Sequence, residues 1–327
     1  MDESKLYAYC LQGDVIAAYK YLRSVPDKNA KFIELESKYY QRFFSENPND
    51  RFKSEDPWIQ KVLSFYFEYF RSVLTHKSVI YSENRLRRSL SDLIYGHQQD
   101  EELDRLEEQL SIQFKEKGYQ FVGGVTPPYR GPYIWKKTDK ENFTVELPHH
   151  TQKVTVYFLS DFILQSWAHY ATFGEKFAGG WAKPDGLYYV ADRPEHKKEN
   201  HDCREFQISY LKHEAQHFSD FSRFPHLQAK DLEYRAKLVE LIYEPNSFKL
   251  INKFFYEKKN DPFLPHSYSS LVILKRLSEI AFGVEEIPSL EKWEKLSSDR
   301  VREWALGLYE ENTAKLMENG NQIRGII

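Results

Sequence analysis

The chain has 327 residues, of which 16% are aromatic, so it is long enough for two domains and too rich in core-forming side chains to be disordered. Its formal net charge is −3, and the basic run at residues 85–88 has the pattern of a solvated helix face, so we expect no nucleic-acid partner. The charged residues 1–5, the lack of a long apolar run and the presence of only Cys10 and Cys203 predict a cytoplasmic protein with neither membrane segments nor a disulfide framework.

Residues 1–117 show helical patterns separated by short breaks. The predicted helices are residues 6–11, 15–22, 30–44, 58–74, 82–95 and 101–117. Paired helices of this kind also occur in helical-repeat arrays that bind proteins, but the spacing here has no fixed period. We therefore expect a helical domain that supports the rest of the chain, with binding of a protein partner as the alternative.

From Tyr119 onward the sequence becomes rich in Gly, Pro and β-forming residues. Segments 143–147 and 154–159 alternate in polarity and predict paired strands, followed by a helix over residues 161–170. Residues 174–190 predict a β-hairpin, because its central Lys-Pro-Asp-Gly stretch favours a turn. Gly179 and Gly180 in its first strand either permit close backbone approach or mark a bulge.

Residues 213–217 read His-Glu-Ala-Gln-His, which is an HExxH motif. Apolar residues recur at helical spacing around it, residues 202–223 contain no Gly or Pro, and Asp202 with Glu205 forms a capping-box pattern, so the motif is predicted to lie on a helix. Histidines four residues apart share one helix face, where both imidazoles can reach a single tetrahedral zinc ion, with Glu214 beside the open coordination position.

The residues that follow the motif exclude one class of zinc enzyme. A metzincin would place a glycine and a third histidine where this chain has Asp220 and Arg223, so that class is excluded. Asp220 lies one turn after His217. Its carboxylate could accept the second ring N–H of a zinc histidine, or it could lie in solvent on the helix surface.

A second helix, predicted over residues 231–243 after a proline-marked turn, supplies the candidates for a third zinc ligand. Glu233 and Glu240 are seven residues apart and share roughly one face, so periodicity does not choose between them. Ala236, one turn after Glu233, leaves room for close helix approach and favours Glu233. Glu240 is the alternative.

The HExxH motif followed by a glutamate helix resembles the gluzincins, the thermolysin-like zinc metallopeptidases, over residues 174–243. The resemblance implies a zincin-like domain that uses Zn²⁺, with Glu214 as the general base of the reaction. The zinc ligands that it implies are His213, His217 and Glu233.

The same resemblance implies two further parts of an active site. Related enzymes take an oxyanion donor from a Tyr or His beyond the glutamate helix, and residues 261–268 open a predicted helix with His266 and Tyr268 near its start. In zincin-like enzymes the strand just before the active-site helix pairs with an extended peptide substrate. In this chain that strand lies near residues 179–181.

The sequence thus predicts an α+β protein with a helical domain at residues 1–117 and a zincin-like domain with a mixed sheet at residues 118–327. The predicted function is that of a zinc-dependent peptidase or amidase. The alternative is a non-catalytic zincin-like scaffold whose N-terminal helices bind a protein partner. Glu214 favours catalysis, because a structural zinc site needs no base and would fill all four coordination positions with protein ligands.

Overall fold

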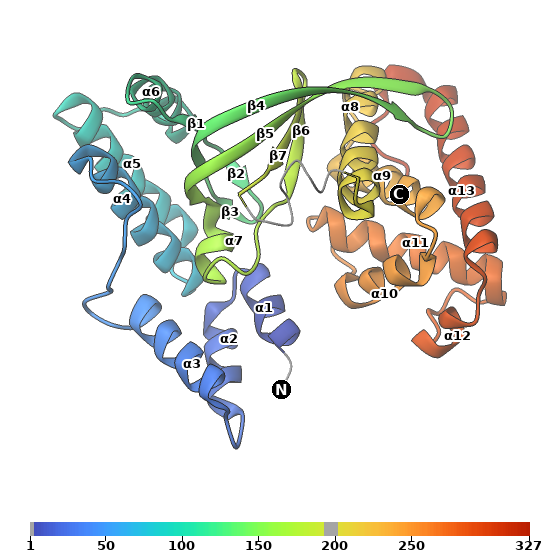
Figure 1. Cartoon of the computed structure of the whole chain (residues 1–327), viewed down its shortest axis with the longest axis horizontal. Coiled ribbons are helices and arrows are strands. Elements are labelled where there is room, and N and C mark those ends of the chain that lie inside the picture. Colours follow the sequence, from blue (N-terminus) through green and yellow to red (C-terminus); the bar gives the residue numbers. More distant parts are fainter. Residues whose placement is uncertain (1–2, 193–201) are drawn as a thin grey trace. The chain divides into compact units, whose positions relative to one another are not determined.

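The computed structural model describes residues 3–192 and 202–327 and mixes helices with a β-sheet, which confirms the α+β class (Figure 1). The chain forms two compact units: unit 1 comprises Met1–Lys137 and Leu159–Ala178, and unit 2 comprises Thr138–Phe158 and Gly179–Ile327. The division does not fall at the predicted boundary after residue 117. The strands that follow this point pack with the N-terminal helices, as when Phe121 stacks on Phe114.

Unit 1 is built mainly from helices. Its helices are α1 (Glu3–Leu11), α2 (Val15–Ser24), α3 (Ala30–Phe43), α4 (Pro57–Leu74), α5 (Val79–Tyr95), α6 (Leu103–Glu116) and α7 (Ser166–Ala171). Four of them begin at residues whose side chains accept hydrogen bonds from first-turn amides: Asp14, Asn29, Asp56 and Ser78. The apolar faces of these helices form one continuous core.

A five-stranded sheet has the strand order β1-β4-β5-β7-β6, and β2 pairs with β3 separately. The strands are β1 (Gln120–Val122), β2 (Val125–Thr126), β3 (Tyr129–Arg130), β4 (Tyr133–Glu146), β5 (Thr151–Gln165), β6 (Gly180–Lys183) and β7 (Gly186–Val190). The helix predicted over residues 161–170 was wrong in its first half. Phe162 and Leu164 continue the period-two burial of β5, so the strand runs on to Gln165.

Unit 2 packs helices on the inner residues of β5 and β7, including Val156, Phe158 and Leu187. Its helices are η3 (Glu205–Lys212), α8 (His213–Arg223), α9 (Ala229–Tyr243), α10 (Ser247–Glu257), α11 (Pro265–Phe282), α12 (Leu290–Glu294), α13 (Ser298–Asn319) and η4 (Gly320–Gln322). In Figure 1 α9 lies among α8, α11 and α13, and it packs against all three. It is therefore the central helix of the unit.

The motif helix begins differently from the prediction. Its first segment, η3, is π-helical, and no side chain caps its start, so the predicted capping box of Asp202 and Glu205 does not form. The α-helical part begins at His213. Within the described ranges, no helix is long and apolar enough to cross a membrane.

Candidate metal centre

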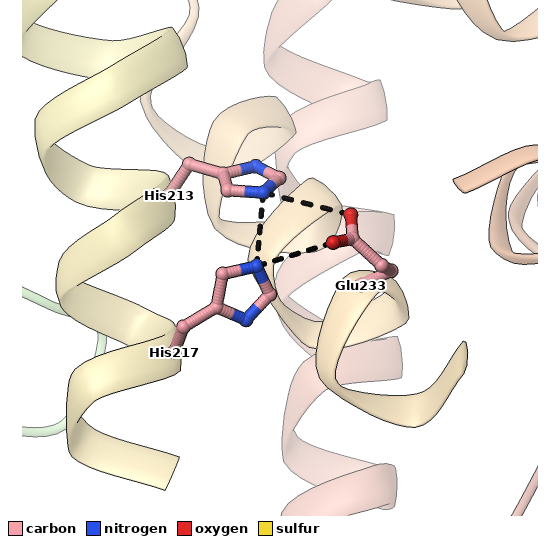
Figure 2. A group of neighbouring side chains, drawn as sticks. All are labelled: His213, His217 and Glu233. Atoms are coloured by element: carbon pink, nitrogen blue, oxygen red, sulfur yellow. Dashed lines mark hydrogen bonds and ion pairs between the residues drawn. The ribbon is translucent and has the colours of Figure 1, made fainter. Parts of the chain in front are cut away.

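The three predicted zinc ligands come together between α8 and α9. His213 and His217 lie one turn apart on α8, and Glu233 on α9 faces them, as Figure 2 shows. The two Nε2 atoms are 3.1 Å apart, and the oxygens of Glu233 lie 3.5 Å from Nε2 of His213 and 3.4 Å from Nε2 of His217. One ligand atom from each residue falls within 4.8 Å of the others, and all three side chains are buried.

The donor atoms of this cluster fit a zinc ion. Nδ1 of His213 lies 2.7 Å from Oε1 of Glu240, a carboxylate oxygen that can only accept, so Nε2 is the ring nitrogen left to face His217 and Glu233. Two imidazole nitrogens and one carboxylate oxygen are a common ligand set of catalytic zinc sites. The Glu233 carboxylate faces Nε2 of both histidines, and its Oε2 is buried without an aligned hydrogen-bond donor in the described part of the chain. A cation at this point would neutralise the carboxylate and use both facing nitrogens.

The charges in the cluster shift the pKa values of its members. Burial lowers the pKa of His213, but the contacts with the carboxylates of Glu233 and Glu240 outweigh burial and raise it to about 10. Burial raises the pKa of Glu233, but the charge of His266 and the contacts with His213 and His217 outweigh burial and hold it well below its usual value. Without a metal, a proton on His213 therefore balances part of the negative charge that a zinc ion would neutralise.

Glu240, the alternative third ligand, lies on the other side of the His213 ring from the cluster. It is 1% exposed, and its Oε1 accepts from Nδ1 of His213. Burial opposes its ionisation, but the charge of Lys253 on α10 and the bond from His213 lower its pKa. It is thus placed to orient a histidine of the candidate metal centre, a role that sequence analysis did not assign to it. The sequence did carry a signal for this role. Glu240 lies two helical turns after Glu233, so both carboxylates lie on the side of α9 that faces α8.

The predicted solvent-exposed position of Asp220 was wrong, because Asp220 is fully buried, and in the described ranges its carboxylate makes no hydrogen bond to a predicted zinc histidine. Its Oδ2 accepts hydrogen bonds from Nε of Arg235 and Nε2 of Gln216, both at 2.8 Å. Arg235 is also fully buried and donates to Tyr309 and Asn312 on α13. This network joins α8, α9 and α13 beside His217, and sequence patterns gave no sign of it.

The two candidate oxyanion donors lie at the start of α11, as predicted, but only one reaches the cluster. His266 places Nδ1 at 2.7 Å from Oε2 of Glu233, and its side chain is 69% exposed. Tyr268 is half-buried, with Nζ of Lys230 lying 6.0 Å from its ring centroid. In the described ranges Tyr268 makes no hydrogen bond to a predicted zinc ligand. The geometry therefore connects His266, and not Tyr268, to the metal cluster.

Glu214 lies half-buried in the first turn of α8, next to a buried tyrosine that sequence analysis missed. Tyr210 is one turn earlier, and its hydroxyl has no hydrogen-bond partner among the described residues. Burial and then the charge of Glu214 raise the pKa of Tyr210 well above its usual value.

The strand predicted to bind substrate, β6, lies at one end of the sheet formed by the described residues. β6 pairs on one side with β7, with Trp181 opposite Tyr188, and it packs against α8. A Cβ atom at Gly180 would lie 2.3 Å from both the carbonyl oxygen of Tyr188 and Cε2 of Tyr210. This glycine therefore permits the close approach of β6 to the motif helix. The predicted close approach of a substrate backbone to this strand stays a prediction.

No family model, curated protein or solved structure matches this chain.

Proposed function

We propose that this protein is a zinc-dependent peptidase or amidase with a gluzincin-like site. The observation that supports the proposal most strongly is the convergence of His213, His217 and Glu233, with ligand atoms within 4.8 Å of one another, on the helix pair that carries Glu214. A structural zinc site would use four protein ligands. Within the described ranges, the cluster has three possible protein ligands. A catalytic zinc site uses three protein ligands and keeps the fourth position for water or substrate.

The proposal assigns a separate task to each part of the site. When bound, zinc would lower the pKa of a water molecule and polarise the carbonyl group of the substrate. The carboxylate of Glu214 would accept a proton from this water and pass it to the leaving amine. Glu240 would orient His213 through Nδ1, and an extended peptide would pair with β6, which lies at one end of the sheet formed by the described residues.

Cleavage of a peptide library by the zinc-loaded chain tests this function. We expect Glu214→Gln to retain zinc but to lose about 10²–10⁴-fold in rate, because the general base is removed while the ligands stay. Glu205→Gln is the matched control, because Glu205 lies on the preceding segment with an exposed side chain paired to Lys249. Zinc binding without any cleavage by the wild-type chain would contradict the proposed enzyme and favour the zincin-like scaffold with a protein partner for the N-terminal helices.

A further inference from the structure

The contact between His266 and Glu233 is the shortest that the Glu233 carboxylate makes with a histidine. Nδ1 of His266 lies 2.7 Å from Oε2, whereas the motif histidines lie 3.4 and 3.5 Å from the carboxylate oxygens. No donor in the described ranges is aligned for a hydrogen bond to Oε2. The histidine nitrogen nearest to this oxygen is Nδ1 of His266, on an exposed ring.

A buried lysine fixes the backbone that carries His266. Lys237, one turn after Glu233 on α9, is 2% exposed, and its Nζ donates to the carbonyl oxygen of His266 at 2.9 Å and to Oγ of Ser270 at 2.6 Å. Its charge is paired with Glu257. A buried ammonium group is costly unless it is fully paired, so this arrangement holds the start of α11 firmly against α9.

Both contacts join α9 to the same residue at the start of α11. Lys237 binds the main-chain carbonyl of His266, and the imidazole of His266 contacts Glu233, which lies on the same helix as Lys237. Residues that orient metal ligands in this way commonly contact the ligand atom that the metal does not use.

We propose that His266 is a positioning residue for Glu233, an inference that rests on the proposed function. Its Nδ1–H would hold Oε2, so that Oε1 alone would be left to ligate zinc and a coordination position would stay open for the substrate. An oxyanion donor would act through Nε2 of the same ring. The two roles therefore depend on different ring atoms and can be separated.

The test uses the affinity of the full-length chain for zinc, measured by competition with a chelating dye. Asn places its side-chain N–H near the position of Nδ1, so His266→Asn keeps the donor, whereas His266→Ala removes it. We expect zinc affinity to fall about 10–100-fold in His266→Ala and to stay near the wild-type value in His266→Asn. His97→Ala, at an exposed histidine of unit 1, is the matched control and should bind zinc normally.

A second measurement reports how Glu233 binds. In the Co²⁺-loaded chain, bidentate binding of Glu233 raises the coordination number and weakens the visible absorption bands. We expect this weakening in His266→Ala and not in His266→Asn. Unchanged zinc affinity and an unchanged Co²⁺ spectrum in His266→Ala would overturn the proposal, and so would equal losses in both variants. A wild-type chain that binds zinc but cleaves no peptide would contradict the proposed function while leaving the positioning role intact.

Discussion

At the scale of single residues, α9 is unusual because most of its charged side chains are buried against polar or charged partners. The buried ones are Asp231, Glu233, Arg235, Lys237 and Glu240. Asp231 accepts from the backbone amides of Ile326 and Ile327, Arg235 pairs with Asp220, and Lys237 pairs with Glu257. These pairs hold elements together. Glu233 and Glu240 face histidines instead, and histidines are partners that a metal ion can share.

A matched pair of substitutions distinguishes the roles of these two glutamates. Glu233→Gln should abolish zinc binding, because it removes a charged ligand. Glu240→Gln should keep zinc but lower the affinity by about 10–100-fold, because it only weakens the orientation of His213. Titration with a zinc-sensitive competitor measures both. Loss of zinc in Glu240→Gln with normal binding in Glu233→Gln would reverse the assignment.

The raised pKa of His213 predicts that zinc affinity depends on pH. The metal-free pKa is about 10, so below that pH zinc must displace a proton from the ring. Apparent affinity should therefore rise about tenfold per pH unit between about pH 7 and about pH 9. The stability of the metal-free protein changes with pH in the opposite direction to the zinc affinity. There the charged His213 stabilises the fold below its unfolded pKa of about 6.5, and this contribution disappears as the pH rises through about 10.

Competition titrations with a dye calibrated at each pH measure this dependence. An affinity that stays constant across that range would show that His213 is already neutral in the metal-free protein.

At the scale of secondary-structure elements, the site depends on close contact between β6 and the motif helix. Gly180→Ala should lower the free energy of unfolding by about 1–3 kcal/mol, because the new methyl group would meet the backbone oxygen of Tyr188 and the ring of Tyr210. Gly179→Ala is the matched control. A Cβ atom there meets nothing within 4 Å, and we expect a change of less than about 0.5 kcal/mol.

Urea titration of both variants gives the two free energies of unfolding. Equal stability of the two variants would mean that β6 can move away from Tyr210 without cost.

Elements with strong local signals could be predicted from the sequence. The helices α1–α6 carry regular apolar faces, four of them start at capping residues, and the structure matches their predicted ranges to within a few residues. The HExxH spacing placed both histidines on one helix face, and the small Ala236, fully buried in α9, pointed to Glu233 as the residue that faces them. In these cases the deciding interaction lies within a helix or one turn of it.

Features that depend on contacts between distant residues could not be predicted. Asp220 looks like a surface residue until Arg235 and α13 cover it, and no periodicity encodes that burial. The role of Glu240 depends on the distance between two helices, and the contact of His266 depends on how Lys237 anchors the start of α11. The π-helical geometry of η3 has no sequence signature that the prediction used.

At the scale of the whole molecule, the candidate metal centre belongs to unit 2 alone. The proposed ligands, base, orienting glutamate and edge strand all lie within Gly179–Ile327. Zinc should therefore slow amide hydrogen exchange in α8 and α9, which the metal would join, and leave exchange in α1–α6 unchanged. Exchange measured by mass spectrometry with and without zinc tests this. Protection that appears equally in both units would show that the metal acts through more than its own unit.

The measurement that tests the central claim most directly is the zinc content of the purified chain, determined by elemental analysis beside Glu233→Ala. The account predicts a single zinc ion per wild-type chain and none in Glu233→Ala, because the cluster of His213, His217 and Glu233 is the proposed binding site. A wild-type chain that stays free of zinc when zinc is supplied, or a Glu233→Ala variant that retains it, would contradict the account.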